Sequence, residues 1–183
     1  MRIRAANTNV EEVETDTVVV SFFEDERPLK GHTGMADWRL CGTLSKFIME
    51  GRIDGHLGEK ILFPMNHRMR CKKVVAMGLG SSKDFNDQAF TGVCRNTADA
   101  VYDLGVAEFS LALPGSILEG FDPAAAAARL CEEVGDRFRR DRDMFRNLSL
   151  LILARGNDLK EINPIVAKYE HRFNEELRMA SRY

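Results

Sequence analysis

The sequence lacks the features that tie a chain to a membrane or attract a nucleic acid. No apolar run approaches the ~20 residues needed to cross a bilayer, and the opening residues, MRIRAANTNVEE, lack the apolar stretch of a signal peptide. The formal net charge is only −2 at pH 7, and Asp136, Asp141 and Asp143 neutralise much of the basic cluster Arg137–Arg142. We therefore expect a cytoplasmic chain with no membrane contact, and we do not expect nucleic acid as a partner.

Cysteine and histidine are few and scattered, which argues against a disulfide framework or a metal centre. None of the cysteines forms a C-x-x-C pair or has a histidine at zinc-site spacing, so we expect small buried hydrophobic residues in a reducing compartment. The histidines stand alone, without an H-E-x-x-H motif, and we expect them on the surface or in loops. The residues concerned are Cys41, Cys71, Cys94, Cys131, His32, His56, His67 and His171.

No motif for enzymatic chemistry is visible in the chain. A serine nucleophile of the G-x-S-x-G kind is absent, and the acidic residues Asp54, Glu59, Asp99 and Asp103 are scattered singly. We therefore expect no catalytic residue, no metal site and no cofactor.

Strand and helix patterns alternate along the 183 residues, of which 44% are hydrophobic and 30% charged. β-branched and aromatic runs predict strands at 2–6, 17–23, 59–65, 74–79, 109–113 and 148–153. Apolar residues at helical spacing predict helices at 37–50, 84–104, 122–140 and 158–182. This alternation predicts one α/β domain over residues 1–183, a mixed sheet of about six strands between two helical layers. The core strand residues should be Val18, Val20, Ile61, Leu62, Val74, Val75, Phe109, Leu111, Leu150 and Ile152.

A glycine turn follows the most apolar central strand, in the segment VVAMGLGSSKDF. Neither a complete G-x-G-x-x-G nor a Walker loop is present, but the turn precedes a predicted helix N-terminus, where free N–H groups favour an anion. Two interpretations stay open: the turn binds a small anionic ligand, or its glycines only let the backbone turn while Ser82 or Asp84 caps the helix. The candidate ligand-binding residues are Gly78, Gly80, Ser81, Ser82 and Lys83.

The order of several motifs in the middle of the chain resembles the N-terminal domain of the leucyl (cytosol) aminopeptidase family. The resemblance covers about residues 17–114 and includes the helix that begins at Asp84-Phe85-Asn86 and ends in Asp103-Leu104-Gly105-Val106. The motifs are Pro28-Leu29-Lys30-Gly31, Asp37, Gly42-Thr43-Leu44-Ser45, Gly51, Gly55, Gly58, Glu59 and the strand Lys73–Gly80.

This resemblance implies a fold like that of macro domains, with the two catalytic metals in a separate C-terminal domain. The signature of that peptidase half, N-T-D-A-E-G-R-L, does not occur here; Asn96-Thr97-Ala98-Asp99-Ala100 shares only its opening letters, with an extra alanine. The resemblance therefore implies a non-catalytic binding, regulatory or assembly module whose partner is itself or a full-length aminopeptidase. The macro-like alternative is binding of ADP-ribose, a nucleotide or phosphate at the Gly78–Lys83 turn.

Overall fold

One six-stranded sheet organises residues 1–180, the part of the chain that the computed structural model describes. The strands are β1 (Arg2–Ala6), β2 (Thr17–Phe22), β3 (Lys60–Pro64), β4 (Lys73–Gly78), β5 (Glu108–Ala112) and β6 (Ser149–Leu153). The helices are α1 (Gly31–Arg39), α2 (Thr43–Met49), α3 (Asp87–Asp103), α4 (Pro123–Phe138), α5 (Arg142–Asn147) and α6 (Asp158–Ala180). The strand order is β1-β6-β5-β2-β4-β3, and neighbours are parallel except β3, which runs antiparallel to β4.

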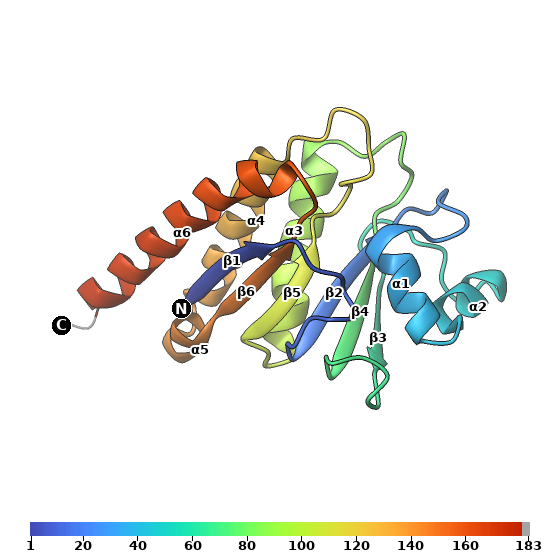
Figure 1. Ribbon diagram of the computed structural model, residues 1–183, viewed down its shortest axis with the longest axis horizontal. Helices are drawn as coiled ribbons and strands as arrows, with labels where there is room; N and C mark the ends of the chain where they lie inside the picture. The colour runs from blue at the N-terminus through green and yellow to red at the C-terminus, as the bar shows by residue number, and fades with distance from the viewer. Residues whose placement is uncertain (181–183) are drawn as a thin grey trace.

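Helices cover both faces of this sheet (Figure 1). Successive strand residues point to opposite faces, so Val19 and Val75 pack with α3, α4 and α6, whereas Val18 and Val74 pack with α1 and α2. The predicted fold class, a mixed six-stranded sheet between helical layers, is confirmed. No helix among residues 1–180 is both long and apolar enough to cross a membrane.

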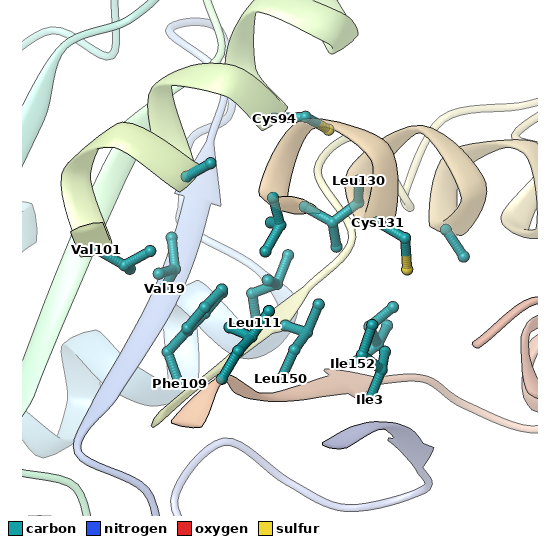
Figure 2. Packing of buried hydrophobic residues seen from close by; sticks show 14 of the residues in the cluster. Ile3, Val19, Cys94, Val101, Phe109, Leu111, Leu130, Cys131, Leu150 and Ile152 are labelled. Atoms are coloured by element: carbon teal, nitrogen blue, oxygen red, sulfur yellow. The ribbon is translucent and has the colours of Figure 1, made fainter. Parts of the chain in front are cut away.

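The larger core lies between the sheet and the α3–α4–α6 layer. Figure 2 shows Phe109, Leu111 and Leu150 pointing from the strands towards Leu130 and Cys131 of α4. Phe109 and Leu130 are each 0% exposed, and burying a side chain of this size contributes about 1.5–3 kcal/mol. Nine of the ten predicted core residues are buried or half-buried, because the apolar alternation in the sequence matches the strand period.

Leu62 is the exception, and its prediction as a core residue is wrong. Its side chain is 45% exposed, whereas Phe63 is 6% exposed and stacks near Phe47 with ring centroids 6.0 Å apart. β3 is an edge strand, so Ile61 and Phe63 on one face meet the α1–α2 core while Leu62 points to the other face at the rim of the sheet.

The predicted helix at 37–50 is two helices, which is a second correction. Cys41 and Gly42 have φ of 57° and 73°, a left-handed conformation that cannot continue a right-handed helix. The carboxylate of the buried Asp37 accepts hydrogen bonds from the backbone amides of Leu44 (2.8 Å) and Ser45 (3.2 Å). Asp37 therefore caps α2 across the corner, a contact that no local helical period reveals.

Two other helix boundaries differ from the predictions, and the predicted end of the last helix lies outside the described residues. α3 begins at Asp87, because Asn86 accepts hydrogen bonds from the amides of Gln88 and Ala89 and so caps it in place of Ser82 or Asp84. α4 ends at Phe138, before the predicted Arg140, and the separate helix α5 follows under the cap of Asp141. α6 contains Pro164 within its first turns, and the predicted residues 181–182 lie outside the described part of the chain.

Asp16 links β2 to β4 at the amino ends of these strands, and its ionisation should make the unfolding free energy depend on pH. Burial by itself raises the pKa of Asp16, but hydrogen bonds from Lys73 (2.7 Å), Lys72 (3.0 Å) and Thr17 outweigh it and lower the pKa from 3.8 to about 2. Because the folded pKa is the lower one, the stabilisation is complete above the unfolded pKa and is lost as pH falls from about 4 to about 2. We expect about 1 kcal/mol, given solvent screening of the pair.

Urea unfolding at pH 6 and pH 3 measures this contribution. An Asp16→Asn variant should be less stable than wild type at pH 6, and the gap should narrow at pH 3. A gap of equal size at both values would contradict the ionic origin of the effect.

Candidate functional site

A crevice of about 160 Å³ lies at the carboxyl ends of β2, β5 and β6. Its wall includes Phe23 after β2, Leu113 after β5 and Ala154 after β6. The chain places β4 and β3 on one side of β2 and places β5 and β6 on the other, so the direction of winding reverses between β2 and β5. In open α/β sheets, ligands bind outside the carboxyl ends of the strands at such a reversal.

Cationic and polar groups from two loops border this crevice. Lys30 and His32 come from the start of α1, and Arg155 follows β6. Among the described residues, the side chains of Lys30 and Arg155 have no hydrogen-bond or salt-bridge partner, and the buried Nδ1 of His32 has no hydrogen-bond partner. The first turn of α1 contains no acidic residue, and the side chain of its N-cap residue, Lys30, makes no capping hydrogen bond.

Burial and a nearby charge both lower the pKa of His32. Burial lowers the pKa of His32 below 6.5, and the nearby positive charge of Arg155 lowers it further. Two carboxylates also line the crevice. Glu26 accepts the backbone amides of Lys30 (2.9 Å) and Phe23 (3.4 Å), and Asp158 lies in the first turn of α6. Both signs of charge therefore line the crevice: Lys30 and Arg155 are cationic, and Glu26 and Asp158 are anionic.

The predicted site at the Gly78–Lys83 turn lies next to this crevice but does not form its wall. Of the turn, Leu79 lines the crevice, and Gly78, Gly80, Ser81, Ser82 and Lys83 do not. The turn's amides are used within the protein: Gly78 donates to the carbonyl oxygen of Glu59 (2.8 Å), Leu79 to that of Phe22 (3.0 Å), and Gly80 to that of Gly55 (2.8 Å). The amide and hydroxyl of Ser82 both donate to Asp25. Ligand binding at the turn stays a prediction, and this geometry favours the structural interpretation.

Close packing explains why glycine stands at position 78. The loop at Gly55 and His56 crosses the end of β4, so that a Cβ atom at Gly78 would lie 2.2 Å from the carbonyl oxygen of His56. Gly80 has a φ of 75°, which glycine adopts without strain. The G-L-G pattern thus lets one backbone segment pass directly over another.

His32, Lys30 and Arg155 were missed as site residues by the sequence analysis. His32 was predicted on the surface or in a loop, whereas it lies in α1, half-buried. Polar residues that follow the parallel strands of a sheet gather at the same edge of that sheet. This rule identifies site residues only when the strand order is known, and the sequence did not provide the strand order.

A second hollow of about 340 Å³ lies between the starts of α3 and α4. Phe85, Phe90, Leu118 and Phe121 form its apolar wall. Phe121 also lines the strand-end crevice, so the segment after β5 separates the two spaces.

Neither the histidines nor the cysteines assemble a metal site. Within residues 1–180, no three His, Cys, Asp or Glu side chains are grouped to hold a metal ion. Cys71, Cys94 and Cys131 are buried as predicted, whereas Cys41 is exposed, contrary to prediction, because it occupies the left-handed corner between α1 and α2. Burial raises the pKa of all three buried thiols, that of Cys71 to about 11 and that of Cys131 to about 12.

Solved structures share this fold at low sequence identity. The Oceanobacillus iheyensis macrodomain with ADP has a TM-score of 0.71 and 12% identity, covering 92% of this chain and 91% of that one. The Trypanosoma brucei macrodomain in complex with ADP has a TM-score of 0.71 and 13% identity, covering 90% and 69%. A mutant tomato leucine aminopeptidase has a TM-score of 0.67 and 20% identity, covering 95% of this chain but 36% of that chain.

Sequence relatives are cytosol aminopeptidases. A probable cytosol aminopeptidase of Halorhodospira halophila is 29% identical over 160 residues, which are 82% of this chain and 32% of the relative. One from Synechocystis sp. is 29% identical over 148 residues, 77% of this chain and 29% of the relative. The chain thus spans about a third of the length of these relatives. The model of the cytosol aminopeptidase family N-terminal domain matches residues 19–142, and the chain therefore belongs to this family through that domain.

Proposed function

We propose that this domain is a non-catalytic binding module that takes a small phosphate-bearing ligand in the crevice at the ends of β2, β5 and β6. The observation that carries the proposal is the crevice itself, where Lys30 and Arg155 have no anionic partner among the described residues. A phosphate group provides the charge and the acceptor oxygens that such side chains bind.

Two further observations support a nucleotide as the source of the phosphate. The macrodomains with ADP named above have the same fold, and the crevice lies at a reversal of strand order, the place where open α/β sheets bind ligands. Its wall also carries apolar residues such as Phe23, Ile117 and Phe121, which suit a sugar or a base.

The size of the crevice limits how much of a nucleotide it can hold. Its 160 Å³ is below the roughly 300–1,000 Å³ of pockets that enclose drug-sized ligands. A phosphate with part of a sugar fits this space, and the remainder would extend past Ile117, which is 55% exposed. We therefore expect ADP and ADP-ribose to bind, and inorganic phosphate to bind more weakly.

A thermal-shift and calorimetry panel of ADP, ADP-ribose, inorganic phosphate and adenosine tests the proposal. A ligand at 100 times its Kd adds about 2.7 kcal/mol, which should raise the Tm by about 5–10 °C in a domain of this size. Arg155→Met should weaken ADP binding at least tenfold, since it removes one of the two exposed cations at the crevice. Arg146→Met is the matched control, because Arg146 is an exposed arginine on α5 outside the crevice. If no phosphate compound raises the Tm or gives heat, the proposal is wrong.

A further inference from the structure

His32 differs from a surface histidine because part of its imidazole ring is buried at the wall of the crevice. Its side chain is half-buried in the first turn of α1, and its Nδ1 atom is inaccessible to solvent and without a hydrogen-bond partner. A buried polar atom that has no hydrogen-bond partner is left with the full cost of its desolvation. This unpaired nitrogen borders a crevice whose cations, Lys30 and Arg155, also have no partner among the described residues, and together these groups point to a ligand that binds there.

The surroundings of His32 favour its neutral imidazole while the crevice is empty. Burial disfavours the imidazolium, and the positive charge of Arg155 disfavours it further. An anion bound between the two residues offsets both effects, because it neutralises Arg155 and accepts a hydrogen bond from a protonated imidazole.

We propose that His32 takes up a proton when an anion binds next to Arg155, so that the crevice holds its ligand more tightly in mildly acidic conditions. This inference rests on the proposed function, and it adds a regulation by pH and a role for His32 as the proton-accepting ligand residue. The balance is simple: one proton leaves the solvent, joins a ring nitrogen of His32, and is released when the anion leaves.

The other charged groups around the crevice do not account for such a response. They are Glu26 and Lys30 before α1, Arg155 after β6 and Asp158 at the start of α6. Carboxylate, lysine and arginine side chains ordinarily titrate outside the range from pH 5.5 to 7.5, whereas histidine titrates within it. Lys30 and Arg155 provide attraction at every pH in this range, and His32 provides the part that varies.

Sulfate is the appropriate probe, because it stays a dianion across this range, whereas the phosphate of ADP changes its own charge. NMR titration of the histidine ring signals should show a pKa for His32 below 6.5 without sulfate and a pKa raised by about one unit or more at saturating sulfate. The Kd for sulfate should fall about five- to tenfold between pH 7.5 and pH 5.5, as expected for uptake of up to one proton.

Two variants separate this inference from the proposed function. His32→Asn places an amide near the position of Nδ1 but cannot be protonated, so it should bind sulfate with a Kd that varies less than twofold with pH. His171→Asn is the matched control: His171 is exposed on α6, and this variant should show the full pH response.

The possible results distinguish the proposed binding function from the proton uptake by His32. If sulfate, phosphate and ADP bind nowhere between pH 5.5 and 7.5, the proposed function is wrong and this inference falls with it. If they bind but the pKa of His32 does not move, or His32→Asn keeps the wild-type pH response, the inference is wrong and the binding function stands. The wild-type titration alone gives this answer if the variant does not fold.

Discussion

A Gly78→Ala variant is expected to lose about 2–3 kcal/mol of unfolding free energy, because its single added carbon meets backbone rather than a movable side chain. The Cβ atom would lie 2.2 Å from the carbonyl oxygen of His56 and 2.6 Å from the carbonyl carbon of Gly55. The loop would have to move away from β4, and the hydrogen bond from the Gly80 amide to Gly55 (2.8 Å) would be strained with it.

Gly92→Ala provides the matched control for this change. Gly92 lies in α3, and a Cβ atom placed there has no neighbour within 4 Å. The same substitution should therefore stabilise the protein by about 0.5–1 kcal/mol, since alanine favours a helix over glycine. Urea unfolding of both variants gives the comparison, and equal effects at the two positions would contradict the packing argument.

Phe173→Ala is expected to be more costly still, at about 3–5 kcal/mol. Phe173 is 0% exposed, and its ring packs near Phe145 and Tyr169 with centroids 5.4 Å and 5.8 Å away. It also lies over Gly135 of α4, where a Cβ atom would be 2.4 Å from the end of the ring. Removing the ring would leave a cavity between α4 and α6.

A double-mutant cycle with Gly135 tests this contact directly. Gly135→Ala should destabilise the wild type, because the buried ring has no free space to move into. In a Phe173→Leu background the clash is relieved, so the same change should become neutral or stabilising through helix propensity. Met179→Ala is the control, because Met179 lies on α6, as Phe173 does, but is 64% exposed. This change should alter the unfolding free energy by less than about 0.5 kcal/mol. Additive effects of the Gly135 and Phe173 changes would contradict the proposed contact.

The sequence was sufficient to predict those elements whose local apolar pattern matches their burial in the folded protein. β2, β4 and β6 are short apolar runs buried by helices, and each was identified close to its observed bounds. The predictions were wrong where a distant partner decides the outcome. Asp37 lies in α1 but caps α2, the following helix. Leu62 is exposed because β3 is an edge strand of the sheet.

The candidate site was less predictable than the fold for the same reason. A glycine turn is visible in sequence, but the role of Gly78 depends on the loop at Gly55 and His56, which packs on it only in the folded chain. His32 and Arg155 are 123 positions apart in the sequence and meet at one crevice because β2 and β6 flank β5. Neither residue carries a motif, so only the strand order reveals that they belong together.

The exposed thiol at the corner after α1 gives the molecule a natural attachment point for a spectroscopic label. Cys41 is exposed whereas Cys71, Cys94 and Cys131 are buried, and burial raises the pKa of those three thiols, so they react slowly at neutral pH. A maleimide dye should therefore modify one position without any prior mutation. Cys41 lies roughly 15 Å along the α1 direction from Gly31 at the crevice, so a fluorophore there would observe the crevice from the far end of the same helix without blocking it.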